Sequence, residues 1–366
     1  MLQYFVGVRS VIYYWLFGLI PAYISLQDLK PRLVRPNGTG AAWKAYLALA
    51  TIFVGLRYEV GTDWPNYLRH YYGADGQRFL DAVLGIDPGY AVVNWVSFQL
   101  GFGLVSVNLV CAILFFLGLA QFCRNQPFPW LALTVAVPYL VIVVAMGYTR
   151  QSVAISLVMF AMTCIGSRQN TKAIIFVLAA ALFHRSAVIM LPFIALSNSE
   201  GRVMIAISTI ALAATFFMLF LYDSADSIYF RYAERQLGSQ GALVRIVMNL
   251  LPALILVFGG NHFKLIDSEK RLWWWVALAS IALVGLLYVS PSSTAVDRIA
   301  LYFIPIQMVV LGRLPLLASQ QKNALPLVVG VVTYSLAIMY TWLNFANNAD
   351  SWLPYRSVLF EHNPLS

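Results

Sequence analysis

The chain has 366 residues, of which 60% are hydrophobic and only 11% are Asp, Glu, Lys or Arg. Soluble domains average about 45–50% apolar and about 25% charged residues, so this composition excludes an ordinary soluble protein. Long apolar runs recur along the whole chain, and in a bilayer such runs are expected to be helices. The fold class is therefore all-α, a polytopic integral membrane protein. The formal net charge of +9 fits basic cytoplasmic loops, so no nucleic-acid partner is expected.

Taken in order, the apolar runs predict about twelve transmembrane helices in one domain, 1–366. The first run continues past the length of a cleavable signal, so we expect a retained helix there. Polar stretches such as 261–271 and 291–298 are expected to be loops or turns. The expected spans are 4–25, 43–56, 101–122, 130–146, 152–165, 173–183, 186–196, 203–222, 243–258, 272–289, 299–311 and 325–343.

The longest connection, 57–100, begins with an unusual concentration of polar and aromatic side chains. The stretch 57–67 contains one arginine, two carboxylates and three aromatic residues directly after an apolar run. The chain stays rich in Asp, Arg, Tyr and Gly up to residue 88, and 91–100 has mixed character. An amphipathic or re-entrant helix could therefore form within this loop.

Alternating the loops across the membrane separates the basic residues by type. All six lysines fall in one set, whereas the other set contains eleven arginines and no lysine. We take the lysine side as cytoplasmic. Both termini and the loops near residues 70, 149, 184, 230 and 297 then lie outside. Eleven of the fifteen carboxylates fall on the same outer side.

The arginine-rich outer side suggests an anion site, because the planar guanidinium binds phosphate and carboxylate in a bidentate way. The alternative is that these arginines cap helix ends and extend their charge to the membrane surface. The chain has no HExxH, CxxC, P-loop or GxSxG motif, so zinc proteases, hydrolases with a nucleophile elbow and ATP-driven transporters lack support. Neither a cofactor nor a metal site is expected.

Four outer positions combine an arginine with a proton-transfer partner at a helix end, and we expect them to converge on one cavity. They are Arg57 with Glu59 and Asp63, Arg150 with Tyr148, His184 with Arg185, and Asp297 with Arg298. Each has a structural alternative: Asp63 could cap a short helix, His184 could be a buried hydrogen-bonded histidine, and Asp297 could pair with Arg298.

These positions form an ordered pattern along the chain that resembles the EpsG family of Wzy-type polysaccharide polymerases. Arg185 departs from the residue that this family usually carries after its histidine. The pattern comprises Arg57, Val60-Gly61-Thr62-Asp63, Tyr67, Tyr148-Thr149-Arg150-Gln151, Ala154, Phe183-His184-Arg185-Ser186-Ala187, Asp297-Arg298, Tyr302 and Pro354-Tyr355.

The resemblance implies a GT-C-like multi-pass glycosyltransferase of the bacterial inner membrane, with its active site facing the periplasm. Such enzymes build O-antigen or exopolysaccharide. They transfer the growing glycan from undecaprenyl pyrophosphate to the next lipid-linked repeat unit, and a chain-length regulator could assist. Arginines suit the pyrophosphate leaving group without a metal, and the acceptor hydroxyl needs a base.

We assign the candidate roles on this basis. Either Asp63 or His184 is the base, and Glu59 completes the catalytic set by positioning sugar. The expected pyrophosphate-binding residues are Arg57, Arg150, Arg298 and Arg185, and the expected sugar-binding residues are Tyr67, Trp64, Tyr148 and Tyr355. Two other classes remain open, a lipid-glycan ligase and a transporter or flippase for a lipid-linked sugar. The absence of a very large outer loop favours the polymerase over the ligase. The concentration of charge at one side disfavours transport.

Overall fold

The structure is a computed structural model that describes residues 2–32, 40–198, 241–290, 293–318 and 323–360, together with residues 201, 207, 211 and 214. Throughout these parts the regular elements are helices, and an isolated bridge between Arg57 and Ser357 is the nearest approach to strand pairing. The all-α prediction is confirmed. Helices satisfy the backbone groups of apolar segments internally, which a bilayer requires.

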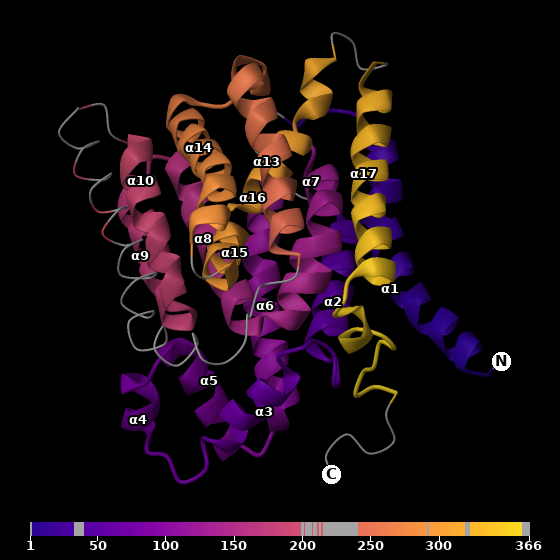
Figure 1. Ribbon diagram of the computed structural model, residues 1–366, viewed down its shortest axis with the longest axis vertical. Coiled ribbons are helices and arrows are strands. Elements are labelled where there is room, and N and C mark those ends of the chain that lie inside the picture. The colour runs from indigo at the N-terminus through magenta and orange to yellow at the C-terminus, as the bar shows by residue number, and fades with distance from the viewer. Residues whose placement is uncertain are drawn as a thin grey trace.

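The helices of the described residues follow the chain in the order shown in Figure 1. The α-helices are α1 (Leu2–Gln27), α2 (Ala41–Gly55), α3 (Trp64–Tyr72), α4 (Phe79–Leu84), α5 (Pro88–Gln99), α6 (Gly103–Arg124), α7 (Pro129–Ala136), α8 (Thr149–Gly166), α9 (Asn170–Phe183), α10 (Met190–Asn198), α13 (Ala242–Gly259), α14 (Asp267–Val289), α15 (Ser293–Ala300), α16 (Pro305–Leu311) and α17 (Ala324–Phe345). A π-helix, Val137–Ala145, continues α7, and short 3-10 turns cover Arg185–Ile189, Gly260–Phe263, Leu301–Phe303, Leu314–Leu317 and Ala349–Ser351.

Several of these helices are long and apolar enough to cross a bilayer. Within the described residues five single helices meet that standard, namely α6, α8, α13, α14 and α17. The pair Ser293–Phe303 and Pro305–Leu317, bent by 42° at Ile304, would make a sixth. Five further apolar helices have 10–17 residues. The expected span 203–222 lies almost wholly outside the described residues, so the count of about twelve and the GT-C-like architecture stay predictions.

Two stretches expected to be turns are partly helical. The turn expected at 291–298 is wrong from Ser293 onward, because α15 begins there. The loop expected at 261–271 also ends early, since α14 begins at Asp267. Asp267 and Glu269 lie in the first turn of α14, where negative side chains interact favourably with the helix dipole. Both helices therefore begin earlier than their apolar residues indicated, because their first turns are polar.

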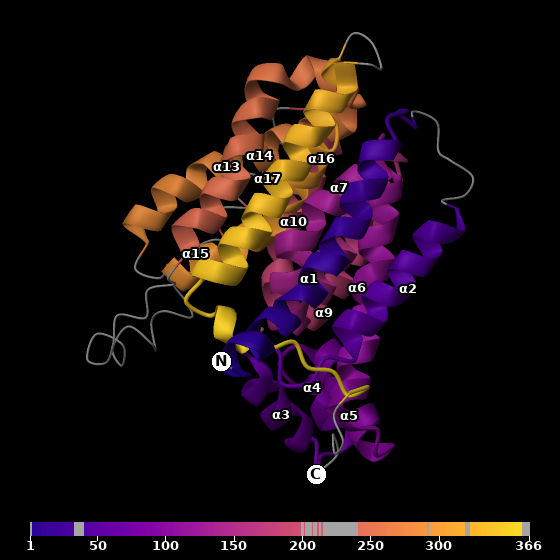
Figure 2. The ribbon, with the colours of Figure 1, turned by 90° about the vertical axis from the view of Figure 1, so that its right-hand side faces the viewer.

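The connection 57–100 folds into a cap of three short helices, α3, α4 and α5. Proline stands near the start of α3 and α5, where its missing N–H costs nothing. Figures 1 and 2 show this cap at one end of the bundle, the same end at which α1 begins and the described chain ends. The cap therefore closes the end that the sequence assigned to the outer side.

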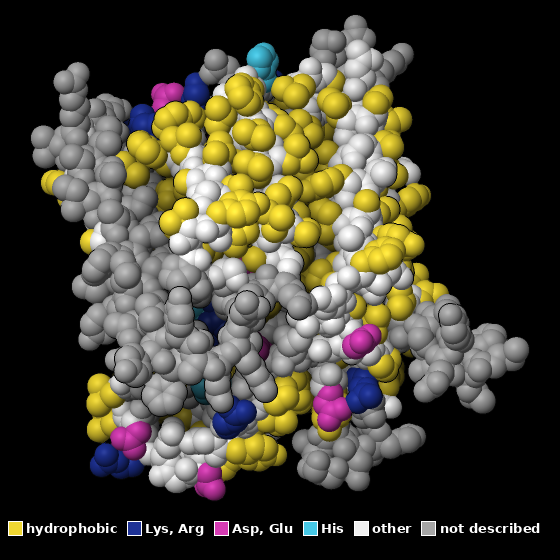
Figure 3. Space-filling view, in the orientation of Figure 1, with side chains coloured by type: hydrophobic (Ala, Val, Ile, Leu, Met, Phe, Trp, Pro, Cys, Tyr) yellow, Lys and Arg dark blue, Asp and Glu magenta, His cyan; other side chains and the backbone are white. Residues whose placement is uncertain are grey.

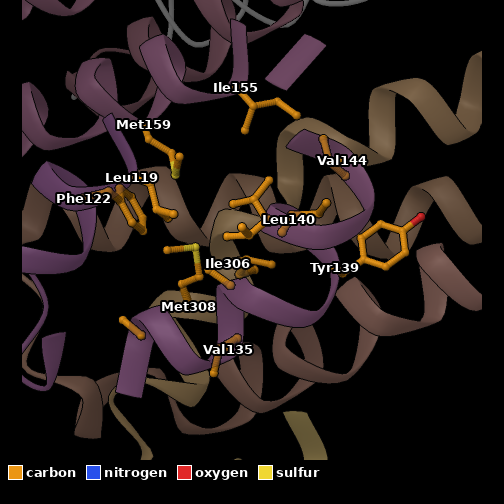
Figure 4. Close-up of a cluster of buried hydrophobic side chains, with 14 of the residues drawn as sticks. Leu119, Phe122, Val135, Tyr139, Leu140, Val144, Ile155, Met159, Ile306 and Met308 are labelled. Atoms are coloured by element: carbon orange, nitrogen blue, oxygen red, sulfur yellow. The ribbon is translucent and has the colours of Figure 1, made fainter. Parts of the chain in front are cut away.

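The core is organised around α7 and the π-helix that continues it. Every residue from Gln126 to Gly147 is buried, so this segment contacts protein on all sides. Figure 4 shows side chains of α6, α8 and α16 packed against it, among them Leu119, Met159 and Ile306. The other helices surround this central segment, and its two ends therefore lie at the two ends of the molecule.

The distribution of side chains on the surface agrees with a membrane protein. On the face shown in Figure 3, hydrophobic side chains cover the middle of the bundle, and charged side chains of the described residues gather toward its two ends. Exposed apolar residues of this kind occur on most long helices, for example Leu117 on α6 and Leu178 on α9. Such a belt in water would be a large exposed apolar patch, whereas lipid solvates it.

Gly61, in the connection to the cap, lies so close to the central segment that we expect no side chain to be tolerated there. Gly61 has φ +103°, and a Cβ there would lie 2.6 Å from the Met146 carbonyl oxygen. We expect Gly61→Ala to cost about 1–3 kcal/mol of stability through overpacking, in addition to the strain of its backbone conformation. The matched control is Gly76→Ala, because Gly76 also has positive φ but open space around it. Thermal unfolding of the two purified variants should show a clearly lower midpoint for Gly61→Ala, and equal midpoints would contradict the packing argument.

Candidate functional site at the capped end of the bundle

The site is built on a break in the buried backbone between the π-helix and α8. At this break the Gly147 carbonyl and the Thr149 N–H are both satisfied by one side chain, the hydroxyl of Tyr67. Thr149 N–H donates to the Tyr67 hydroxyl at 2.8 Å, and this hydroxyl donates to the Gly147 carbonyl at 3.2 Å. Burial raises the pKa of Tyr67, so the hydroxyl retains the proton that it donates. The helix of the central segment ends at this break, so Tyr148 and Arg150 do not continue it.

Arg57 supports the same break from the side of α2. Its guanidinium is 1% exposed and donates to the Val54 carbonyl at 2.7 Å, to Asn108 Oδ1 at 3.1 Å and to Thr149 Oγ1 at 2.7 Å. A buried guanidinium needs such partners, because desolvating the charge without them is very costly. The structure therefore places Arg57 beneath the site, where it holds α2, α6 and α8 together.

A narrow hollow opens above this break. It is lined by Asp63, Tyr67, Tyr148, Arg150, Gln151, His184 and Arg298. Six of these seven residues belong to the sequence-predicted set, and they come from four separate parts of the chain. The hollow has a volume of ≈ 20 Å³, which is room for about one or two waters. Any larger ligand therefore requires the surrounding side chains to move apart.

Asp63 stands at the N-cap position of α3, but its side chain makes no capping hydrogen bond to that helix. Its Oδ1 accepts from the Asn66 amide at 3.3 Å, an exposed and long contact. Asp63 therefore occupies the backbone position of a helix N-cap, but its carboxylate does not cap the helix. That carboxylate lines the hollow.

Arg150 is positioned by Asp87, a residue that the sequence reasoning missed. Arg150 Nη1 donates to Asp87 Oδ2 at 2.9 Å, and the guanidinium also lies 5.8 Å from the centre of the Tyr90 ring. The other Asp87 oxygen accepts from the Arg185 backbone N–H at 3.2 Å. Asp87 has φ +53°, a conformation uncommon for aspartate, and its side chain is only 6% exposed. The signal in the sequence was Asp87-Pro88, a helix start hidden in what looked like a loop.

His184 follows the end of α9 and contacts two hydroxyl groups on one side of its ring. Nδ1 lies 2.6 Å from Ser186 Oγ, and Ser186 Oγ donates to the Tyr302 hydroxyl at 3.1 Å. The Tyr302 hydroxyl also lies 3.5 Å from Nδ1. Burial, together with Arg298, Arg150 and Arg185, lowers the pKa of His184 to about 3. The imidazole is therefore neutral at physiological pH.

Asp297 pairs with Arg245 of α13 and not with its neighbour Arg298. Both carboxylate oxygens of Asp297 accept from Arg245, each at 2.5 Å, and both side chains are largely buried. The expected alternative of an Asp297–Arg298 pair is therefore wrong. Arg298 is exposed and lines the hollow, and none of the carboxylates in the described residues pairs with it. Its backbone carbonyl accepts from Gln151 Nε2 at 2.6 Å, which fixes α15 against α8.

The remaining predicted site residues lie around the hollow without lining it. Glu59 forms an exposed ion pair with Arg356, and Trp64 is buried against Tyr58. Tyr355 stacks on Phe53 with 4.2 Å between ring centres and donates to the Phe53 carbonyl. The Arg185 side chain is exposed, and only its backbone reaches Asp87.

A larger cavity of ≈ 270 Å³ lies at the opposite end of the bundle. Its lining includes Arg32, Gln126, Ser167, Lys264 and Arg313, all from connections that the sequence placed on the lysine side. Arg313 donates to Gln126 and to the carbonyls of residues 263 and 264, so it serves to join these connections. Volume alone would favour this cavity, but the predicted proton-transfer residues meet at the smaller hollow. We therefore regard the smaller hollow as the candidate site.

Within the described parts of the chain, no group of three or more His, Cys, Asp or Glu side chains is placed to hold a metal ion. The bundle and its arginine-lined hollow define a multi-pass membrane protein with a site suited to an anionic ligand. The EpsG family model matches residues 45–357, and the chain belongs to this Wzy-like polysaccharide polymerase family. This membership identifies a polysaccharide polymerase-type membrane protein, with glycosyltransferase-like activity in general. No curated protein and no solved structure matches the chain.

The Asp87–Arg150 pair should be strongly coupled, because Asp87 is buried and its removal leaves a partly buried guanidinium without its partner. In a double-mutant cycle of Asp87→Asn and Arg150→Gln, we expect a coupling of about 1–3 kcal/mol in the free energy of unfolding. Thermal or denaturant unfolding of the purified variants measures it. The matched control is the exposed pair Arg78–Asp81, with 82% and 45% side-chain exposure, for which we expect no measurable coupling. Equal coupling in both cycles would show that Asp87 does not position Arg150.

The low pKa of His184 predicts that the folded protein loses stability at mildly acidic pH. Its pKa in the folded protein is about 3, whereas an unfolded histidine titrates near 6.5. As the pH falls, His184 takes up a proton in the unfolded chain before it does so in the folded protein. The stability that neutral His184 contributes is therefore fully present above about pH 6.5 and is lost as the pH falls toward about 3. Between about pH 7 and about pH 5, the wild type should lose about 2 kcal/mol more stability than His184→Gln. Unfolding midpoints at the two pH values test this, and parallel losses in both proteins would contradict it.

Proposed function

We propose that the protein is a polysaccharide polymerase that acts on glycans carried by undecaprenyl pyrophosphate. The growing glycan would be moved from its carrier to the next lipid-linked repeat unit, as in O-antigen or exopolysaccharide synthesis. The observation that carries the proposal is the meeting of Arg150 and Arg298 with Asp63 and His184 at one hollow, at one end of an apolar bundle. Family membership supports the polymerase class.

Two arginines at the hollow suit the leaving group of this reaction. Arg150 uses Nη1 for Asp87, which leaves the rest of its guanidinium for a ligand. Arg298 has no acidic partner in the described parts of the chain, since Asp297 is occupied by Arg245. A pyrophosphate that develops negative charge as its bond to the sugar breaks would be stabilised by both. In this mechanism the reaction is metal-independent, because the arginines supply the positive charge.

The chemical step is a displacement at the anomeric carbon. The acceptor hydroxyl oxygen forms a bond to the anomeric carbon of the growing chain, and the bond from that carbon to the pyrophosphate oxygen breaks. The acceptor proton passes to a base, and the lipid pyrophosphate leaves with the electron pair. We assign Asp63 as this base, because its carboxylate lines the hollow and makes no capping bond.

His184 has a second role in the same mechanism. Burial and the three arginines Arg298, Arg150 and Arg185 hold the pKa of His184 low. A bound pyrophosphate would offset the arginine charges, and the pKa of His184 would then rise toward its ordinary value. The imidazole would therefore take up a proton more readily when the anion is present. Glu59 and Arg185 lie at the margin, where Glu59 would position sugar that extends out of the hollow.

Sugar binding would use the aromatic residues at the same end. Tyr148 lines the hollow and can stack on a sugar ring, and Tyr67 lines it as well. Trp64 and Tyr355 are engaged in ring contacts within the protein, so we expect them to shape the walls. Because the hollow holds only ≈ 20 Å³, the donor must enter by moving Arg298 and its neighbours outward.

The proposed setting is the bacterial inner membrane, with the hollow and both termini on the periplasmic side and with membrane lipids around the bundle. The lysine side would then face the cytoplasm. We propose the same one-sided arrangement that multi-pass GT-C-like transferases use, with a chain-length regulator as a further partner.

A polymer-length gel tests the roles of the hollow residues. In cells that lack their own polymerase, wild-type protein should restore long polymer, whereas Arg150→Gln and Arg298→Gln should each lower the rate by about 10²–10³. Asp63→Asn should lower the rate by about 10²–10⁴. The matched control is Arg69→Gln, because Arg69 is an exposed arginine of α3 at the same end and does not line the hollow. Full-length polymer with all three hollow variants, at normal protein level, would refute the mechanism.

Purified protein and isolated lipid-linked repeat unit separate the polymerase from its alternatives. Elongation on the carrier lipid supports polymerisation. Transfer of the glycan to a different lipid acceptor would indicate a ligase, and movement across a vesicle membrane without covalent change would indicate a transporter or flippase.

A further inference from the structure

The cap exposes an apolar edge beside the hollow that neither the bundle nor the site chemistry explains. On α4 and the residues after it, Leu80, Val83, Leu84 and Ile86 are exposed by 61%, 39%, 81% and 77%. The same short helix turns Ala82 inward, where it is buried. Exposing several large apolar side chains on six to eight residues is costly in water, so this edge is expected to contact apolar material.

This edge continues an apolar surface of α9. The cap packs on the end of α9 at Gly89, where a Cβ would lie 3.0 Å from the Phe183 ring. On α9 itself Leu178 and Leu182 are exposed by 51% and 49%. Figure 1 shows α4 directly below α9 at the same side of the molecule. We name the surface formed by Leu178, Leu182, Val83, Leu84 and Ile86 the α4–α9 strip.

The strip ends at the residue that positions the anion site. Ile86 is followed directly by Asp87, whose carboxylate holds Arg150 at 2.9 Å. An amphiphile with a pyrophosphate at Arg150 would therefore have its apolar chain at the start of the strip. A polyprenyl pyrophosphate, the carrier in the proposed function, combines such a charged head with a long apolar tail.

We propose that the α4–α9 strip binds the polyprenyl chain of the lipid-linked substrate while its pyrophosphate contacts Arg150. The inference rests on the proposed function and deepens it by giving the carrier lipid a route from the membrane to the hollow. Bulk membrane lipid would also cover the strip. In that case substitutions in the strip would not change how tightly a polyprenyl pyrophosphate binds. The test therefore compares ligands that share the head and differ in the tail.

Undecaprenyl pyrophosphate and geranyl pyrophosphate serve as long-tailed and short-tailed probes, and binding to the full-length protein in detergent is measured by native mass spectrometry. Leu84→Gln and Ile86→Gln should each weaken the long-tailed probe by about tenfold, as expected for removing one large apolar contact. Neither should change binding of the short-tailed probe. Arg150→Gln should weaken both probes. The matched control is Phe345→Gln, since Phe345 is 68% exposed at the end of α17, on the other side of the bundle.

The outcomes separate the strip from the anion site. If Arg150→Gln weakens both probes while the Leu84 and Ile86 variants bind the long-tailed probe as the wild type does, the strip is not the tail site and the anion site stands. Equal weakening by Phe345→Gln would likewise overturn the strip, because any lipid-facing apolar residue would then suffice. If the wild type binds neither probe, the proposed function fails together with the inference.

Discussion

The arrangement of this protein depends on one buried backbone break, between Gly147 and Thr149, that must be satisfied without water. In an apolar bundle an unpaired carbonyl or N–H costs several kcal/mol, so irregular backbone persists only where protein groups pair it. The Tyr67 hydroxyl supplies both partners, and Arg57 adds a bond to the Thr149 side chain. Once these contacts are made, α8 starts in a new direction, with Arg150 partly exposed at the hollow and Gln151 buried beside it.

The cap is a consequence of the same constraint. Tyr67 can reach the break only if α3 lies across the end of the bundle, and Gly61 permits this approach because it has no side chain to meet Met146. The C-terminal segment closes the other side, where the Trp352 ring fits over Gly147 and its indole N–H donates to the Ile142 carbonyl. Residues far apart in the chain therefore converge on the break, and the hollow is the space that remains between them.

The sequence was most informative where polar residues stood out against an apolar background. Asp63, Tyr67, Arg150, His184 and Arg298 could be selected because each lies near the end of an apolar run, and helix ends at one side of a bundle must meet. The sequence could not assign their partners, since pairing depends on which helices are neighbours. Asp87 was missed for this reason, as it lies in a segment with little periodicity and acts through a contact 63 residues away along the chain. Arg57 shows the opposite case. Its residue type suited phosphate binding, but the side chain is buried, and its guanidinium is hydrogen-bonded to backbone and side-chain groups of the protein.

The pairing of charges at the capped end explains why one arginine is left for a ligand. Asp87 takes Arg150, Asp297 takes Arg245 and Glu59 takes Arg356, so these three acids of the described residues have basic partners, whereas Asp63 forms no ion pair there. A buried carboxylate selects the guanidinium that can approach in a bidentate geometry. Arg245 on α13 does so at Asp297, whereas the adjacent Arg298 is exposed and lines the hollow. Within the described parts of the chain, Arg298 is therefore left at the hollow without an ion-pair partner, next to a neutral imidazole. At the opposite end Arg313 is consumed by carbonyls and Gln126, so the same residue type there joins connections and leaves no comparable charge for an anion. Chemistry at one end of the bundle therefore follows from which acids are buried beside which arginines, and not from the number of arginines at that end.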